Sequence, residues 1–275
     1  MEERKMKKFT KILAVILAAL FVVGCFAACS GSSNEEEKTL LKVGFDQDGF
    51  VPFGYTDENG DWTGFDLELA KECIALMDGY DDIELVPLEW NSKDTLMDTG
   101  AVDIIWNGFT IQGREDKYEW TKPYMSNRQV VIVAEDSGIN NLGDLADKIV
   151  GTQKDSSGLD AIESNEELMA IIKDNAPMQF DGYETALMEL EVGSVDALVI
   201  DEQVISVKIK NGDAEGIKIL DEALSTEDYG VGAKKGNTEL IAAIENALNT
   251  LAENGKVAEL SEKYFGYDAT VWAAE

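Results

Sequence analysis

Two segments of the sequence carry polar groups of opposite charge that suit a small zwitterion. The segment "NGFTIQGRED" (107–116) offers the backbone of Gly108, the hydroxyl of Thr110 and the guanidinium of Arg114. The segment "DEQVIS" begins with the carboxylate of Asp201. Arginine holds a carboxylate through two parallel hydrogen bonds, whereas aspartate accepts from an ammonium group, and each charge-assisted bond contributes about 1.5–3 kcal/mol. These residue types therefore favour binding of a molecule that carries both a carboxylate and an ammonium group.

Each of these two charged residues also has a simpler interpretation. Arg114 is followed by Glu115 and Asp116, so it could be a solvated loop residue that pairs with one of them. Asp201 stands directly before "EQVIS" and could be the N-cap of a helix, where aspartate accepts hydrogen bonds from the first backbone N–H groups. Spacing alone leaves both interpretations open.

The composition excludes several other kinds of chemistry. The chain of 275 residues contains no His, which excludes Ser-His-Asp and Cys-His nucleophile systems and zinc sites that need imidazole. Its 23 Lys and Arg residues against 54 Asp and Glu residues give a formal charge of −31, which opposes binding to nucleic acid or to an anionic membrane surface. We expect no metal and no cofactor.

Both polar segments follow apolar runs of the kind that form buried strands. Strand-like runs alternate with helical patterns along the chain, which predicts β-α-β units and mainly parallel sheets. The expected strands cover residues 40–46, 83–89, 102–108, 129–135, 148–153, 195–201 and 217–222. The expected helices cover residues 64–78, 91–99 and 183–192, with two more helices joined at Gly255. Ligands of such sheets bind beyond the carboxyl ends of the strands, where the two polar segments lie.

One pattern occurs twice in the chain. The segments "LMDTGAVDII" (96–105) and "LEVGSVDALV" (190–199) share a helix end, a Gly, any residue, Val-Asp and an apolar strand. The repetition indicates two similar α/β lobes. Chance is the alternative, because Gly-x-Val-Asp is a common junction between a helix and a strand.

The N-terminal segment has the pattern of an export signal. A basic start precedes an apolar run from Ile12 to Val23, which is shorter than the roughly 20 residues of a bilayer-spanning helix. The following "VVGC" resembles the lipobox of bacterial lipoproteins, whose cysteine receives a diacylglycerol, and this identifies Cys25. "FAAC", ending at Cys29, is the alternative, and an ordinary secretory signal is a second one. We expect a signal peptide over 1–24 and a lipid-anchored flexible tether over 25–39.

A series of motifs resembles one family over nearly the whole mature chain. The motifs occur in order as "VGFDQDGFVPFGYTDENGDWTGFDLELAKE" (43–72), "LEWNSKDTLMDTGAVDIIWNGFTIQGRED", "WTKPY" (120–124) and "YGVGAKKGNTEL" (229–240). They resemble the family 3 solute-binding proteins of bacterial amino-acid ABC importers, in lipoprotein form. The resemblance implies an α/β, two-lobe fold of the type II periplasmic-binding-protein kind, in which each lobe is a mainly parallel sheet flanked by helices. Lobe 1 would comprise 40–128 plus 228–275, lobe 2 would comprise 129–227, and the ligand would bind in the cleft between them.

The resemblance also implies roles for ten residues of the cleft. Asp46 would lie near the ligand side chain, and Phe50 and Trp90 would enclose the ligand. The groups around the α-ammonium and α-carboxylate would be Asn107, Gly108, Thr110, Arg114, Ser156, Ser157 and Asp201, with Arg114 as the carboxylate clamp and Asp201 as the second-lobe anchor for the amine. Without the resemblance, the two aromatic residues would be assigned to the core and residues 154–158 to a loop and helix cap.

The function implied is that of a receptor, not of an enzyme. The protein would be exported, anchored by lipid to the outer face of the bacterial cytoplasmic membrane and monomeric. Hinge closure on a free amino acid would present it to an ABC permease and its ATPase. The acidic chain and Asp46 favour basic and polar amino acids, including cystine, over acidic ones. The alternatives are a sensory surface lipoprotein that uses the same cleft and a dehydratase-like enzyme with Glu89 or Asp46 as acid or base.

Overall fold

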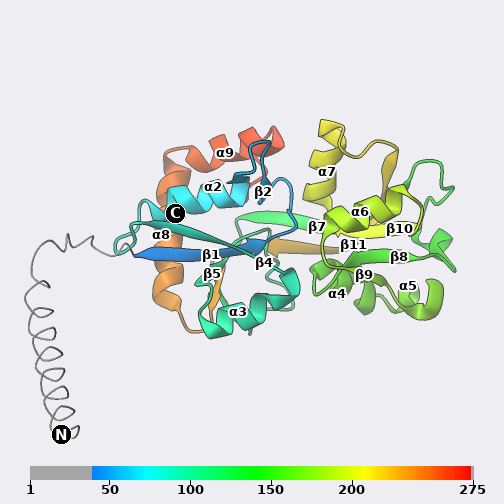
Figure 1. Cartoon of the computed structure of the whole chain (residues 1–275), viewed down its shortest axis with the longest axis horizontal. Coiled ribbons are helices and arrows are strands. Elements are labelled where there is room, and N and C mark those ends of the chain that lie inside the picture. The colour runs from blue at the N-terminus through cyan, green and yellow to red at the C-terminus, as the bar shows by residue number, and fades with distance from the viewer. Residues whose placement is uncertain (1–38, 274–275) are drawn as a thin grey trace, which may run out of the picture. The chain divides into compact units, whose positions relative to one another are not determined.

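The computed structural model describes residues 39–273 of the chain. The expected signal peptide, Cys25 and Cys29 lie outside the described residues and stay predictions. Within 39–273, no helix has both the length and the apolar character needed to cross a membrane. This region forms two five-stranded sheets and a small hairpin, β2 (Tyr55–Thr56) with β3 (Trp62–Thr63), all flanked by helices (Figure 1).

The first sheet combines parallel and antiparallel strands. Its strands lie in the order β4 (Asp82–Leu88), β1 (Leu40–Asp46), β5 (Ile104–Ile105), β12 (Gly232–Lys234) and β6 (Tyr118–Trp120). β1 pairs parallel with β4 and β5, whereas β12 pairs antiparallel with β5 and β6. The helices around it are α2 (Phe65–Ile74), α3 (Lys93–Thr99), α8 (Thr238–Glu253) and α9 (Lys256–Phe265), with a 3-10 turn η1 (Trp90–Ser92) before α3. α2 and α9 lie over one face of this sheet and α3 lies over the other (Figure 1).

The second sheet has the same mixed character. Its strands lie in the order β11 (Ile217–Tyr229), β7 (Met125–Ala134), β10 (Ala197–Asp201), β8 (Val150–Gln153) and β9 (Met178–Phe180). β8 pairs parallel with β9 and β10, and β7 pairs antiparallel with β10 and β11. Its helices are α4 (Ser157–Ser164), α5 (Glu166–Ile171), α6 (Tyr183–Glu191) and α7 (Glu202–Asn211), and its 3-10 turns are η2 (Leu142–Leu145) and η3 (Lys173–Asn175).

The apolar strands of the second sheet are buried on both faces. Along β7, Val130 and Ile132 pack with residues of α6 and α7 in one apolar cluster, whereas Val131 and Val133 pack in another with Ile162 of α4. Successive side chains of a strand point to opposite faces, so each face needs its own helices. Figure 1 shows α6 and α7 on one side of the sheet and α4 and α5 on the other.

The α/β class is confirmed, but the sheets are mixed rather than mainly parallel. The chain passes from the first sheet to the second between β6 and β7, and it returns between β11 and β12. The long strands β7 and β11 run antiparallel to each other as far as the pair Met125 and Tyr229, so the outgoing and returning segments lie side by side. The returning strand β12 then enters the first sheet antiparallel to β5. The division into 40–128 plus 228–275 and 129–227 stays a prediction.

The repeated Gly-x-Val-Asp pattern has the same structure at both places. Gly100 and Gly193 follow the ends of α3 and α6 with φ angles of 74° and 75°, a left-handed backbone that glycine adopts without a steric penalty. The Asp103 Oδ2 atom accepts a hydrogen bond from the Lys42 N–H of β1 at 2.9 Å. Asp196 Oδ2 accepts from the Ile149 N–H, directly before β8, at 2.8 Å. Each aspartate thus ties the strand that it precedes to the neighbouring parallel strand.

We predict that Asp103→Ala and Asp196→Ala each lower the free energy of unfolding by about 1 kcal/mol, because each leaves a partly buried strand N–H without its acceptor. For a chain of this size, the midpoint of thermal unfolding should fall by roughly 2–4 °C. Asp213→Ala is the matched control, since Asp213 also follows a helix-ending glycine but its side chain is exposed. Midpoints of both variants equal to that of the control would show that the two aspartates do not support the strands.

Candidate functional site

All ten residues assigned to the cleft line a single pocket. The pocket has an empty volume of about 320 Å³, and Gln153 and Tyr183 complete its lining. Three of its acidic and amide side chains, Asp46, Gln153 and Asp201, are the last residues of β1, β8 and β10. The pocket therefore lies at the carboxyl ends of strands from both sheets, as α/β topology predicts. The roles of these residues in ligand binding stay predictions.

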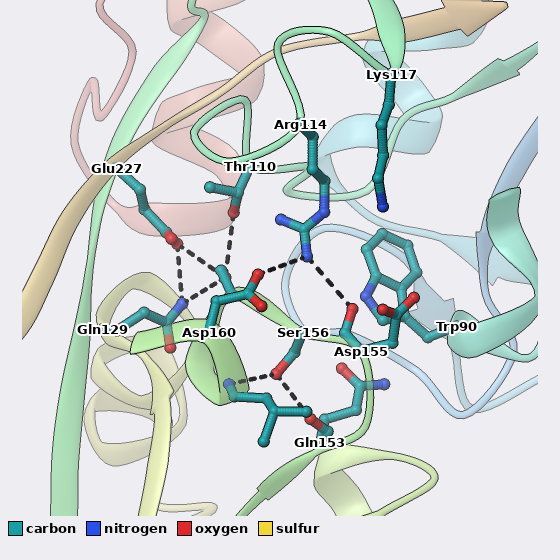
Figure 2. Close-up of polar contacts among 12 residues, drawn as sticks. Trp90, Thr110, Arg114, Lys117, Gln129, Gln153, Asp155, Ser156, Asp160 and Glu227 are labelled. Atoms are coloured by element: carbon teal, nitrogen blue, oxygen red, sulfur yellow. Dashed lines mark hydrogen bonds and ion pairs between the residues drawn. The ribbon is translucent and has the colours of Figure 1, made fainter. Parts of the chain in front are cut away.

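Arg114 points into the pocket and away from its sequence neighbours. Its side chain is 6% exposed, and its Nη2 atom donates to the backbone oxygen of Asp155 at 3.4 Å and to Asp160 Oδ2 at 3.3 Å (Figure 2). Both acceptors belong to the segment that leads from β8 into α4. Within the described residues, the Nε and Nη1 groups of this guanidinium have no acceptor. Pairing of Arg114 with Glu115 or Asp116 is thus contradicted, and two donors remain for an incoming carboxylate.

The amino end of α4 faces the same pocket. Ser156 is the N-cap, since its Oγ atom accepts from the Leu159 N–H at 3.2 Å, and it donates to the Gln153 backbone oxygen at 2.8 Å. The hydroxyl of Ser157 accepts a hydrogen bond from Thr110 Oγ1 at 3.2 Å. A helix N-terminus offers unpaired N–H groups and a partial positive charge, which attract an anion. Residues 154–158 are therefore a loop and helix cap that also line the pocket.

Asp201 does not cap the helix that follows it. It occupies the N-cap position of α7, but its side chain makes no capping hydrogen bond. Its Oδ1 atom instead accepts from Asn127 Nδ2 at 2.8 Å, from Gln129 Nε2 at 2.9 Å and from the hydroxyl of Tyr229. Burial, followed by the negative charge of the adjacent Glu227, raises the pKa of Asp201 to about 8. The carboxylate is thus held toward the pocket by neutral donors.

Asp46 is buried at the end of β1 and contacts the second sheet. Its Oδ2 atom accepts from Gln153 Nε2 of β8, and its Oδ1 atom accepts from the Asp48 N–H at 2.9 Å. The chain turns after β1 and brings the Asp48 N–H back to this carboxylate, but no cation among the described residues forms an ion pair with it. Burial raises the pKa of Asp46 to about 6, although both hydrogen bonds act in the opposite direction.

Gly108 has a backbone that other residues would adopt only with strain. Its φ angle is +55°, and a Cβ atom at this position would lie 2.7 Å from Cε1 of Phe50. Its N–H donates to Oδ2 of Asp66, at 2.6 Å, and Asp66 also accepts from the Tyr124 hydroxyl at 2.7 Å. Burial raises the pKa of Asp66 to about 7. Within the described residues no donor reaches the Gly108 carbonyl, which leaves it as an acceptor beside the pocket.

Aromatic side chains form the apolar walls of the pocket. The ring of Phe50 stacks on Phe53 and on Tyr183, with centroids 5.4 and 5.9 Å apart. Trp90 packs edge-on against Phe109 with the centroids 5.5 Å apart, and Lys93 Nζ lies 5.0 Å from the centroid of the Trp90 ring. Phe50 and Trp90 are therefore part of the core and part of the pocket lining at once.

Two polar atoms of the lining are buried without a partner among the described residues. They are Nδ2 of Asn107 and the hydroxyl of Tyr183. An unpaired buried donor costs about 1–3 kcal/mol, which a bound polar molecule would recover. The described residues contain no cluster of His, Cys, Asp and Glu side chains that could hold a metal ion.

The sequence analysis missed several polar residues of the site. Gln153 is the last residue of an expected strand. The search for polar residues at the carboxyl ends of strands, which identified Asp201, would also have identified Gln153. Tyr183 begins an expected helix and carried no signal. Glu227, Asn127 and Gln129 lie within strands, and nothing in the sequence places them beside Asp201.

Known proteins resemble the chain over almost its full length. Residues 41–267 match the family of bacterial extracellular solute-binding proteins, family 3. The L-cystine-binding protein TcyJ of Escherichia coli K12 is 28% identical over 262 residues, which cover 94% of this chain and 95% of that protein. The probable amino-acid-binding protein YxeM of Bacillus subtilis 168 is 30% identical over 272 residues, covering 97% and 98%.

A solved structure shows the same fold. An ABC uptake transporter substrate-binding protein from Streptococcus pneumoniae with bound histidine superposes with a TM-score of 0.80 and 30% identity, covering 84% of this chain and 94% of that one. The expected family is therefore confirmed: the chain belongs to the bacterial extracellular solute-binding proteins, family 3.

Proposed function

We propose that this protein is an amino-acid receptor of an ABC importer. One observation carries the proposal: Arg114 and Asp201, from elements that adjoin different sheets, line one buried pocket that also holds the amino end of α4. This set of groups is complementary to an α-carboxylate and an α-ammonium. The relatives named for binding cystine and amino acids, and the structure with histidine, support the same class of ligand.

The two ends of the ligand would be held by different groups. The α-carboxylate would bind the free Nε and Nη1 groups of Arg114 together with the N–H groups of Ser156 and Ser157 and the hydroxyl of Ser157. The α-ammonium would donate to the carbonyl of Gly108, to Thr110 and to Asp201. Asp160, which now contacts Arg114, is 62% exposed, so a ligand carboxylate can displace it with little loss.

Four polar contacts join residues that adjoin the first sheet to residues that adjoin the second sheet, and they hold the pocket closed. The pairs are Gln153 with Asp46, Thr110 with Ser157, Lys93 with Asp155 and Arg114 with Asp160. Figure 2 shows Thr110, Arg114 and Trp90 facing Asp155, Ser156 and Asp160. We infer that the expected lobes rotate about the two connections between the sheets. A ligand that contacts both lobes would then favour the closed arrangement.

Basic and polar amino acids, including cystine, fit the pocket better than acidic ones. Asp46 is a buried carboxylate that lines the pocket together with Phe50 and Tyr183, and we infer that the ligand side chain would lie beside it. Gln153 offers a neutral donor to Asp46 and would remain as its partner when a neutral ligand binds. A ligand carboxylate at this position would face Asp46 directly and be repelled.

The cellular setting is also a proposal. The family is extracellular, and the N-terminal pattern adds a lipid anchor at Cys25, with Cys29 as the alternative. The partners would be an ABC permease and its ATPase, with the protein acting as a monomer and not as an enzyme. Holding a zwitterion through Arg114 and Asp201 needs no bond to be made or broken.

Arg114→Ala and Asp201→Asn should each weaken amino-acid binding by 10-fold to 100-fold or more, because each removes a charge-assisted contact worth about 1.5–3 kcal/mol. The measurement is thermal unfolding of the ligand-free protein with each amino acid and with cystine. A ligand at 100 times its Kd adds about 2.7 kcal/mol to stability.

Arg128→Ala is the control for that experiment, since Arg128 pairs with Glu202 on the surface and is 45% exposed. It should leave the ligand-induced shift unchanged. If Arg114→Ala retained the full shift with the same ligand, the assignment of the carboxylate clamp would be wrong.

Asp46→Asn should alter selectivity rather than abolish binding. We expect affinity for arginine and lysine to fall about 10-fold or more, whereas affinity for glutamine should change little, because only a cationic side chain uses the charge at this position. Titration calorimetry on wild type and variant measures both affinities. An equal loss for charged and neutral ligands would place Asp46 outside side-chain recognition.

A further inference from the structure

A second carboxylate lies beside the proposed amine anchor. Glu227 of β11 is 5% exposed and was assigned no role above. Its Oε1 atom accepts from Asn127 Nδ2 at 2.7 Å and from Gln129 Nε2 at 2.9 Å, the same two amide groups that donate to Asp201 Oδ1. Figure 2 shows Glu227 directed toward Gln129. Two acidic side chains thus converge on one pair of neutral donors.

Among residues 39–273, no lysine or arginine forms an ion pair with either of these two acids. Arg114 is engaged with Asp160, and Lys93 is engaged with Asp155. Arg128 lies between Asn127 and Gln129 in β7 but pairs with Glu202 at the surface.

The groups that donate hydrogen bonds to the two acids are neutral near pH 7. Ser157 of α4 donates to Glu227 Oε1 at 3.4 Å, and Thr110 contacts Ser157. Three tyrosines are buried near the pair, namely Tyr183 of α6, Tyr229 of β11 and Tyr124 next to Tyr229, and burial raises the pKa of each well above its ordinary value. The charged neighbours Arg128, Glu202 and Asp228 share an open hollow with Glu227, and there Arg128 pairs with Glu202. The fixed surroundings therefore supply the two acids with hydrogen bonds but with no ion pair.

Two buried carboxylates that accept from the same pair of amide groups repel each other, so the doubly ionised pair is disfavoured when no cation pairs with it. We propose that Asp201 and Glu227 share one proton in the ligand-free protein, and that the α-ammonium of the ligand displaces this proton when it binds. The inference rests on the proposed function and deepens it, since it makes Glu227 a part of the amine site.

The charges balance in this exchange. The free pair with one proton carries a charge of −1. On binding, the ligand keeps its ammonium group, the shared proton passes to the solvent, and the pair becomes −2 beside a charge of +1. The buried site therefore has the same net charge before and after binding, and no bond other than the O–H bond is broken.

The first test is calorimetry at pH 7 in two buffers with different ionisation enthalpies. The twenty standard amino acids and L-cystine are the probes, and the tightest binder is used for wild type, Glu227→Gln and Glu222→Gln. Glu222 lies on the same strand but is exposed, so it is the matched control. The same ligand is used for all three proteins. Any proton that the ligand itself releases therefore cancels in the difference in proton release between two proteins.

Wild type and Glu222→Gln should release up to one proton more than Glu227→Gln. Their Kd should also fall with rising pH between 6 and 8, by up to tenfold per unit, and this dependence should be weaker in Glu227→Gln, in which burial alone raises the pKa of Asp201. Equal proton release in all three proteins would overturn the inference while leaving the proposed function intact. Binding of none of the probes would overturn the proposed function itself.

The second test needs no ligand. A carboxyl with a raised pKa binds more protons folded than unfolded, so stability falls as pH rises through the interval from its ordinary value to the raised one. For Asp201 this interval runs from 3.8 to about 8. Glu227→Gln removes the repulsion, so its Tm relative to wild type should rise by about 3 °C between pH 5 and pH 9.

The Tm of Asp201→Asn relative to wild type should also rise between pH 5 and pH 9. This variant replaces Glu227→Gln in the test if Glu227→Gln does not fold. Asp46 and Asp66 also titrate in this interval, but they do so in every variant and cancel in the difference. A Tm difference independent of pH in both variants would show that the pair holds no shared proton.

Discussion

The structure depends on keeping a carboxylate buried at the end of β10 with no ion pair to a cation of residues 39–273. Asp201 is held by Asn127 and Gln129 of β7 and by Tyr229 of β11, so the antiparallel pair that joins the two sheets also supplies the donors for the anchor. An arginine or lysine there would neutralise the site and leave nothing for an ammonium group to pair with. Neutral donors hold the side chain in place and leave its charge without a partner among the described cations, and under the proposed function the ammonium group of the ligand would be that partner.

The guanidinium of Arg114 is also held in the pocket by contacts within the protein. Arg114 is buried against the ring of Phe109, with its guanidinium carbon 5.7 Å from the ring centroid, and its acceptors come from the segment before α4. The fold separates this cation from Asp201 by placing the first on a loop after β5 and the second at the end of β10. Arg114 and Asp201 therefore carry opposite charges and come from elements that adjoin different sheets, and under the proposed function a molecule with both charges would pair with the two.

The sequence predicted the parts of the site that depend on local pattern. Strand ends after residues 46 and 201, together with the family motifs, were enough to identify ten residues of the lining. Contacts between segments that are distant in the sequence could not be predicted. Glu227 meets Asp201 only because β11 pairs with β7, and β5 ends at Ile105, short of the expected residue 108, because Gly108 leaves the strand to approach Phe50.

Each contact between the sheets contributes only a modest net free energy. This suits a receptor, because a receptor must open and close around its ligand. The hydrogen bond between Thr110 and Ser157 has a net value of about 0.5–1.5 kcal/mol, because it replaces bonds to water, and the bond from Gln153 to the Asp46 carboxylate has one of about 1.5–3 kcal/mol. The acids that meet Lys93 and Arg114 have side chains 49% and 62% exposed, so solvent screens both pairs. If closure were strongly favoured by these contacts alone, a ligand could add little to it. A small intrinsic preference leaves the charges of the ligand to decide between the open and the closed arrangement.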